Sequence, residues 1–361
     1  MRSGVLVAAL ALVVLAGCTP PNPAPSPTPT PTEASPTPTA APALPDRPGA
    51  AFPGGCDDLV PRASSVAPGG AVSFVPTVLD LPAAEAASAE QAGTLRCTWA
   101  FTASGDERDE LSVALHRHAG DLVPGLAGGG VGYPGGSPAQ IDADESSILC
   151  SAYQERQSCQ LMFVVGDYLG IVSLSVTTAD DVSVASTALT GALTDTVDRL
   201  RTSDEPAGWT PPEGSWTIPI DCGALVADGS LAAGAGWSSA VVVDDPGMGV
   251  EPTSDLGGLT SCPLSDGAGE GFLAFLTAGG AWIWEDVAAL PGLVEVEIDG
   301  ADHAGVICDS SPASCQAVAV VGPNVVTALG SADFSTGAGP ELAARLEAAL
   351  RGLVAGAATL T

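Results

Sequence analysis

The chain contains no lysine, and all eleven of its basic residues are arginine. A Walker-A phosphate loop and a Schiff-base enzyme both depend on a lysine side chain. The motifs of protein kinases and penicillin-binding proteins need one as well. The G-x-S-x-G and H-E-x-x-H patterns of serine hydrolases and zinc proteases are also missing from the sequence. The lysine-dependent classes are therefore excluded, whereas a hydrolase with a Ser-His-Asp arrangement outside these patterns is not.

Aromatic residues and positive charge are scarce. Aromatics make up 4% of a chain that is 46% hydrophobic, so its cores must be built from Val, Leu, Ile and Ala. With 42 acidic residues the net charge is −31. A field of that sign repels nucleic acid, so no nucleic-acid partner is expected. It would attract cations or basic partners, and it would equally serve to keep an exposed protein soluble.

The longest apolar run is short and lies near the start of the chain. It spans Val5–Leu15, after Arg2, and leads into Gly17-Cys18. Eleven residues are too few for a membrane span, which needs about 20, whereas they suit a removed signal peptide. The segment resembles the lipobox of bacterial lipoproteins. That resemblance implies cleavage after residue 17, lipidation of Cys18 (a diacylglycerol on its thiol, with a fatty acid such as palmitate on the new N-terminus), and a protein held on the outer face of the cell membrane. The alternative is an ordinary secretory signal followed by a chance cysteine.

Residues 18–48 comprise Cys18 and a tether of thirty residues (19–48) that is rich in Pro, Ser and Thr. Such a composition favours extended polyproline II structure and cannot make a core. At about 3.1 Å per residue, its thirty residues would reach on the order of 90 Å. We therefore expect a disordered spacer between the lipid and the folded part of the chain.

The remaining eight cysteines indicate an internal duplication. Their gaps are 41, 53 and 9 residues in the first set of four, and 40, 46 and 7 in the second. The flanking residues match as well, because a Cys-Gln pair is followed by Val-Val-Gly in both sets. The first set is Cys56, Cys97, Cys150 and Cys159, and the second is Cys222, Cys262, Cys308 and Cys315.

Each repeat has the same predicted elements. Strands are expected at 96–102 and 110–116 in the first repeat, and at 261–264 and 271–276 in the second. Apolar hairpins follow at 160–176, turning at Gly166-Asp167, and at 316–329, turning at 322–324. Apolar residues at steps of three and four then predict a closing helix at 182–200 and another from Pro340 to Leu353. The fold class is α+β, with two tandem antiparallel sheets each packed by a C-terminal helix: repeat 1 at 49–202, a linker at 203–214 and repeat 2 at 215–361.

An even number of cysteines outside the cytoplasm indicates disulfides. The last two cysteines of each set are close in sequence and pair easily, which leaves the first two for each other. The favoured pairs are Cys56–Cys97, Cys150–Cys159, Cys222–Cys262 and Cys308–Cys315. Zinc is the rival, but the spacings lack the paired knuckles of zinc sites.

Polar clusters give only weak site candidates. His116 and His118 would share a strand face and could hold a metal with a third ligand, but without such a partner a solvated strand end is the better explanation. His303 precedes a strand and is expected at the surface. Two acidic groups, Asp142–Glu145 and Asp244-Asp245, lack the pattern of an EF-hand. No metal or cofactor is therefore predicted.

Two further patterns have plain structural alternatives. Gly130–Gly135 matches G-x-G-x-x-G, but Pro134 and the absence of a following helix favour a loop over a nucleotide site. Trp282 and Trp284 alternate with Ile283, which predicts a strand with both rings on one side. If exposed, these rings are candidate binding residues for a sugar or a partner, and if buried they belong to the core.

The arrangement resembles uncharacterised actinobacterial lipoproteins that carry a lipobox, a Pro/Thr tether and a small disulfide-bonded α+β domain, some of them PsbP-like. The residues that carry it are Cys56–Val60, Cys97-Thr98-Trp99 and the helix at 182–200, while Cys262-Pro263-Leu264 departs from the Cys-x-Trp strand. The resemblance implies no catalytic residue. We expect a non-enzymatic envelope protein that binds or senses a small ligand or a partner protein; the alternatives are a cell-wall hydrolase and a structural spacer.

Overall fold

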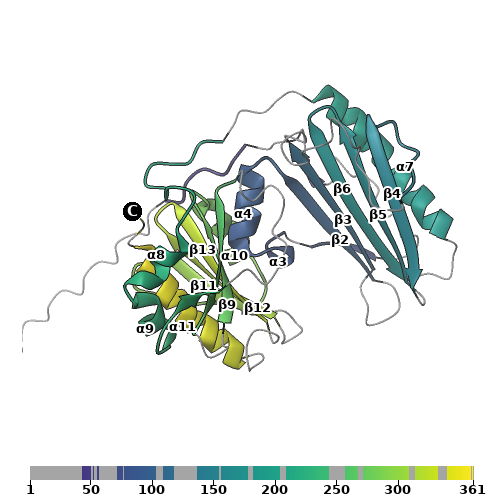
Figure 1. The fold of residues 1–361 in the computed structure, drawn as a ribbon. Coiled ribbons are helices and arrows are strands. Elements are labelled where there is room, and N and C mark those ends of the chain that lie inside the picture. Colours follow the sequence, from purple (N-terminus) through teal and green to yellow (C-terminus); the bar gives the residue numbers. More distant parts are fainter. Residues whose placement is uncertain are drawn as a thin grey trace, which may run out of the picture. The chain divides into compact units, whose positions relative to one another are not determined.

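The computed structural model describes residues 43–49, 52, 55–56, 71–75, 77–102, 109–117, 136–153, 156–177, 182–203, 209–243, 257–266, 271–308, 314–331, 340–358 and 360. All of these belong to one unit, which spans residues 41–361 (Figure 1). Cys18, the predicted signal sequence and nearly all of the predicted tether lie outside the described residues. So do His118, Asp244-Asp245 and Gly130–Gly135.

The first half of the unit contains a six-stranded antiparallel sheet, here called sheet A. Its strand order is β1-β2-β3-β6-β5-β4. The predicted hairpin is confirmed, because β5 and β6 pair across Gly166, whose φ of 57° is a conformation that glycine adopts without strain. The strands are β1 (Ala71–Val75), β2 (Leu95–Thr102), β3 (Asp109–Arg117), β4 (Glu145–Tyr153), β5 (Arg156–Val165) and β6 (Tyr168–Thr177).

Helix α7 (Val182–Thr202) covers one face of sheet A (Figure 1). Its predicted apolar stripe is buried at Leu189, Leu193, Val197 and Leu200. Alternate residues of the strands point at this stripe and complete the core. Phe163 is among the largest of them and lies against Gly170, where a Cβ atom would be 2.2 Å from the ring.

The second half contains a seven-stranded antiparallel sheet, sheet B, with the order β10-β11-β12-β13-β9-β8-β7. Read from its other end, sheet B begins β7-β8-β9-β13-β12-β11. Numbered by their order in the chain, these six strands are arranged in the same way as the six strands of sheet A. An additional strand, β10, lies at one edge. The strands are β7 (Val241–Val242), β8 (Leu259–Ser265), β9 (Gly271–Thr277), β10 (Val294–Glu295), β11 (His303–Cys308), β12 (Ser314–Val321) and β13 (Asn324–Ser331).

Helix α11 (Pro340–Ala357) packs on one face of sheet B, as its periodicity predicted. Two short helices, α8 (Cys222–Ala227) and α9 (Ser230–Ala235), pack against it. Helices α9 and α11 approach closely at Gly234 and Gly352, since a Cβ atom on Gly352 would lie 2.4 Å from the carbonyl oxygen of Leu231.

The opposite face of sheet B is covered by residues from the first half of the chain. Helices α3 (Thr77–Asp80) and α4 (Ala83–Gln91) precede β2 in sequence, and α4 lies against β9, β13 and β8 (Figure 1). Small side chains of α4 pack there with Phe275, Val318 and Val325. Sheet B is therefore the middle layer of three, with α11 on one side and α4 on the other.

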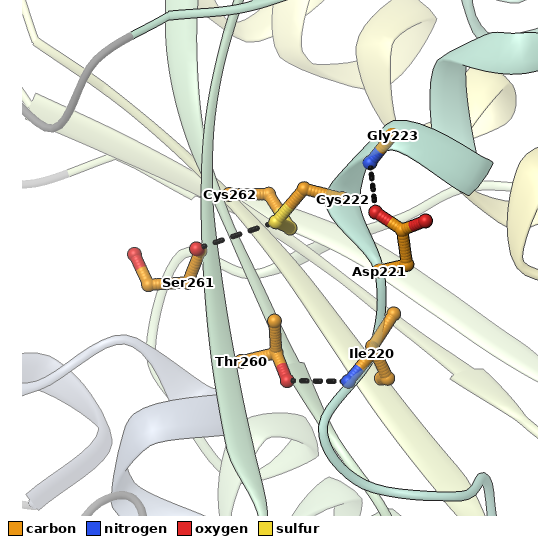
Figure 2. The surroundings of a disulfide bond; sticks show 7 residues. All are labelled: Ile220, Asp221, Cys222, Gly223, Thr260, Ser261 and Cys262. Carbon is orange, nitrogen blue, oxygen red and sulfur yellow. Dashed lines mark hydrogen bonds between the residues drawn. A yellow bond between two sulfur atoms is a disulfide. The ribbon is translucent and has the colours of Figure 1, made fainter.

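All eight cysteines of the two sets form disulfides, in the four pairs that the spacing favoured. Cys222–Cys262 ties the start of α8 to β8, where Asp221 caps the helix by accepting a hydrogen bond from the Gly223 amide at 2.8 Å (Figure 2). Cys150–Cys159 and Cys308–Cys315 each join directly opposed residues of two neighbouring strands. No thiol of these eight cysteines is available for zinc or for catalysis.

One predicted element is wrong. Residues 282–284 form no strand: Trp282 and Ile283 lie in a 3₁₀ helix, η1 (Ala281–Ile283), and Trp284 begins helix α10 (Trp284–Ala288). All three side chains are buried. A short run of large apolar residues can therefore lie in a buried helix as well as in a strand, and here it did not distinguish between them. No helix in the described part of the chain is long and apolar enough to cross a bilayer.

A cavity beside helix α4 as candidate functional site

A cavity of about 490 Å³ lies beside helix α4. Its walls come from α3 and α4, the start of β2, the segment after α10, and the chain around Cys56. Most of the lining is apolar: Phe52, Val78, Ala86, Ala89, Leu95, Ala289, Leu290 and Pro291. A concave, mostly apolar site with a few polar groups is the usual form of a small-molecule site.

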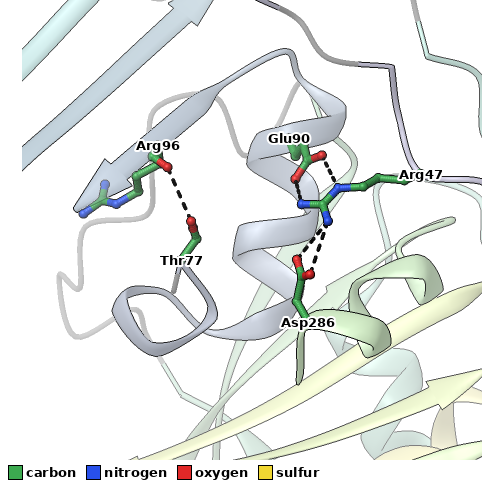
Figure 3. Close-up of polar contacts among 5 residues, drawn as sticks. All are labelled: Arg47, Thr77, Glu90, Arg96 and Asp286. Carbon is green, nitrogen blue, oxygen red and sulfur yellow. Dashed lines mark hydrogen bonds and ion pairs between the residues drawn. The ribbon is translucent and has the colours of Figure 1, made fainter. Parts of the chain in front are cut away.

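Arg47, near the C-terminal end of the predicted tether, lies at the rim of this cavity. The guanidinium of Arg47 binds both carboxylate oxygens of Glu90 on α4, each at 2.6 Å, and lies 3.1 Å from a carboxylate oxygen of Asp286 on α10 (Figure 3). It also lies over the ring of Trp282, 4.7 Å from the ring centroid. The hydrogen bonds to Glu90 are the main reason that the pKa of Arg47 is raised above its ordinary value.

The backbone of Arg96 fixes the opposite wall. Its carbonyl oxygen accepts a hydrogen bond from the Thr77 hydroxyl at 3.4 Å (Figure 3). The same oxygen lies 3.5 Å from the Cys56 sulfur. The first residue of α3 and the Cys56–Cys97 disulfide are therefore held against the same point of β2. This part of the cavity does not depend on long, flexible side chains.

His116 lies just behind the cavity wall and is fully buried. Its Nδ1 is 3.1 Å from the hydroxyl of Thr94, a lining residue, and its Nε2 has no hydrogen-bond partner among the described residues. Burial, with a smaller contribution from the charge of Arg96, lowers the pKa of His116 to about 4. The expectation of a solvated strand end is therefore wrong for His116, and its proposed companion His118 lies outside the described residues.

The two predicted binding tryptophans are both core residues. The ring of Trp282 lies against the guanidinium of Arg47, and the ring of Trp284 stacks on that of His303 with 5.3 Å between centroids. Neither ring offers an exposed face for stacking a sugar, which matches the core alternative that the sequence left open. His303 itself is half-buried rather than fully at the surface.

A second hollow, of about 440 Å³, lies next to His303. Its polar lining is mostly acidic, with Glu295, Glu297, Asp299 and Asp302. Asp302 has a structural task, because its carboxylate accepts a hydrogen bond from the Gly322 amide at 2.8 Å. Among the described residues, no three His, Cys, Asp or Glu side chains are placed to hold a metal ion.

The acidic group of the first half is also explained by local structure. Asp144 accepts a hydrogen bond from the Gly166 amide at 2.7 Å, which fixes the β5–β6 turn. Arg201 at the end of α7 lies within ion-pair distance of both Asp142 and Asp144. These residues therefore join α7 to the sheet.

The sequence missed the cavity because its polar rim comes from distant segments. Arg47 is 43 residues from Glu90 and 239 from Asp286, so no motif could connect them. The one local signal is Arg47 itself, since no other basic residue lies between Arg2 and Arg62. The cavity combines apolar walls with a rim at which Arg47 is paired with two carboxylates, and these features suit a site that holds a ligand.

Comparisons with known proteins do not assign this chain to a class. No family model matches it, and no curated protein does. A solved structure, that of DynU16 from the dynemicin biosynthetic locus, is 10% identical over 80% of this chain and 96% of that chain. Its TM-score is 0.16, which is too low to support any conclusion about fold or function.

Proposed function

We propose that this protein is a lipid-anchored, non-enzymatic protein of the outer face of the cell membrane, and that it binds a small apolar or amphipathic ligand in the cavity beside α4. The observation that carries the proposal is the cavity's size and mostly apolar lining. Its charged rim groups are already paired with one another, which suits orienting a ligand rather than transferring protons. The lipobox at Cys18 and the four disulfides support the extracytoplasmic location.

We also propose that the folded unit arose by duplication of one α+β domain, as the cysteine spacing predicts. The shared strand order of sheets A and B supports this. A further match is found at the hairpin turns. The backbone amides of Asp144 and Asp302 each donate a hydrogen bond to a strand carbonyl oxygen at 2.9 Å. Their carboxylates each accept a hydrogen bond from the amide of the turn glycine, which is Gly166 for Asp144 and Gly322 for Asp302.

The two long-range disulfides match in the same way. The sulfur of Cys56 lies 3.5 Å from the carbonyl oxygen of Arg96, and that of Cys222 lies 3.5 Å from the carbonyl oxygen of Ser261 (Figure 2). Both carbonyls belong to the residue just before the second cysteine of the pair. In a duplicated domain of this kind, helix α4 of the first copy covers the sheet of the second copy, and the cavity lies beside that helix.

Binding can be tested with a neutral apolar fluorophore such as N-phenyl-1-naphthylamine. We expect saturable binding to the folded unit, and we expect Ala89→Leu, which adds bulk to the cavity wall, to weaken it at least tenfold. Ala233→Leu, at an exposed position of α9, is the matched control and should bind as the unsubstituted protein does. Non-saturable binding, or equal affinity in both variants, would overturn the proposal, and hydrolysis of cell-wall material by the purified protein would favour the enzyme alternative.

The anchoring proposal has its own test. We expect the protein to fractionate with membranes and to incorporate labelled palmitate, and we expect Cys18→Ser to abolish both. Ser26→Ala in the tether is the control and should leave both unchanged. Recovery of the Cys18→Ser variant in the membrane fraction with retained label would contradict lipidation at this residue.

A further inference from the structure

The segment just before the folded unit is bound as an extended peptide would be. Leu44 packs against the cluster formed by α4, η1 and α10, Pro48 is buried, and Arg47 between them reaches Glu90, Asp286 and Trp282. Residues 43–49 form no helix or strand of their own. The surface beside α4 therefore accommodates a short chain with a leucine and, three residues later, an arginine.

The geometry around Arg47 meets each requirement for recognising a guanidinium group. Glu90 receives two parallel N–H donors at 2.6 Å, a geometry that an ammonium group cannot reproduce. Trp282 supplies an aromatic face at 4.7 Å. Asp286 adds a second carboxylate, so the site holds two negative charges for one positive one.

We propose that Glu90, Asp286 and Trp282 form a recognition site for an arginine side chain on an extended segment of a partner protein, and that Arg47 occupies this site as a competitor in cis. This inference goes beyond the ligand of the apolar cavity and does not depend on it. The chain's charge of −31 favours the approach of a basic partner segment.

The cis contact is exchangeable. About half of the Arg47 side chain is exposed, and 29% of Glu90 and 38% of Asp286 are exposed as well. Ion pairs at such exposed positions contribute little to stability, because water screens them. Arg47 competes with a partner arginine at the effective concentration that its short connection to the folded unit provides. For short linkers this effective concentration is in the millimolar range.

The test uses the protein with Leu44→Ser and Arg47→Ser, which vacate the site, and the chain's own segment as a probe in trans: a blocked peptide of sequence ALPDRPG. The indole N–H resonance of Trp282 in NMR spectra is the readout, because that N–H has no hydrogen-bond partner among the described residues. We expect a saturable shift with the peptide, and at least tenfold weaker binding when its arginine is replaced by glutamine. The unsubstituted protein should also bind at least tenfold more weakly, because Arg47 competes.

Two further variants complete the test. Adding Glu90→Gln and Asp286→Asn to the vacated site should abolish the preference for the arginine peptide. If the double change disturbs folding, Arg47→Lys keeps the charge and loses the two-pronged geometry, and it should admit the arginine peptide more readily than the unsubstituted protein does. Equal binding of the arginine and glutamine peptides, or equal binding to the vacated and unsubstituted proteins, would overturn the inference, whereas the fluorophore assay would be unaffected.

Discussion

The side chain of Gln316 on strand β12 caps helix α4 at Ala83, 233 residues earlier in the chain. Its Oε1 accepts a hydrogen bond from the Ala83 amide at 3.1 Å, and its Nε2 donates to the carbonyl oxygen of Val78 at 2.7 Å. Thr327 on β13 accepts the next amide, that of Ala84, at 3.0 Å. The residue at the N-cap position of α4 is Pro82, which has no side-chain group for this task. Sheet B therefore supplies the cap that the helix itself lacks.

Thr327→Val tests this capping. The change keeps the shape of the side chain but leaves the buried Ala84 amide without its partner, which should lower the free energy of unfolding by about 1–3 kcal/mol. Thr217→Val, at an exposed position, is the control and should change it by less than about 0.5 kcal/mol. Denaturant unfolding measures both. Equal midpoints for the two variants would show that α4 does not depend on this cap.

The elements that the sequence predicted correctly have local signals. The β5–β6 hairpin is marked by Gly166-Asp167 between two apolar runs, and α11 by leucines at steps of four from Leu342. The disulfide pairs followed from spacing alone. In each case the residues that determine the structure lie within about twenty positions or carry a distinctive chemistry.

Helix α4 gave no such signal. Alanines at 83, 84, 86, 87 and 89 are all buried, so the helix has no polar face to contrast with an apolar one. Its caps, Gln316 and Thr327, lie more than 230 residues away. The rim of the cavity could not be predicted for the same reason, because Arg47 and Asp286 lie 239 residues apart in the chain.

Two glycines inside helices should respond oppositely to alanine. A Cβ atom added to Gly191 in α7 would have no atom within 4 Å, so Gly191→Ala should stabilise the protein by up to about 1 kcal/mol through helix propensity. A Cβ atom on Gly352 in α11 would lie 2.4 Å from the Leu231 carbonyl oxygen, so Gly352→Ala should destabilise it by about 1–3 kcal/mol through overpacking. Thermal unfolding of both variants is the measurement. A stabilised Gly352→Ala variant would contradict the close approach of α9 and α11.

The long-range and local disulfides of the second half should differ in their contribution to stability. Cys222–Cys262 closes a loop of 40 residues and Cys308–Cys315 one of 7. In the chain-entropy model, these loop lengths correspond to about 4 and about 2 kcal/mol. Paired Cys→Ala variants, unfolded in denaturant under oxidising conditions, compare them directly. A larger loss for the Cys308–Cys315 pair would show that native packing, rather than loop entropy, controls the difference.

His116 should make the protein less stable in mild acid. Its pKa is about 4 in the folded protein and 6.5 in the unfolded chain, because burial disfavours the imidazolium. Between these values the unfolded chain binds a proton that the folded protein does not, so stability falls as the pH drops from about 6.5 to about 4, and the full shift corresponds to roughly 3 kcal/mol. Above about pH 7 the histidine is neutral in both states and has no such effect.

The matched variant for this prediction is His116→Gln, which keeps a side chain able to hydrogen-bond Thr94 and does not titrate. The many carboxylates of this chain also change stability with pH, so the informative quantity is the difference between the two proteins rather than either curve alone. We expect the stability of the unsubstituted protein, relative to the variant, to decrease between pH 6.5 and 4 in denaturant unfolding. A constant difference across this range would show that His116 is not held neutral behind the cavity wall.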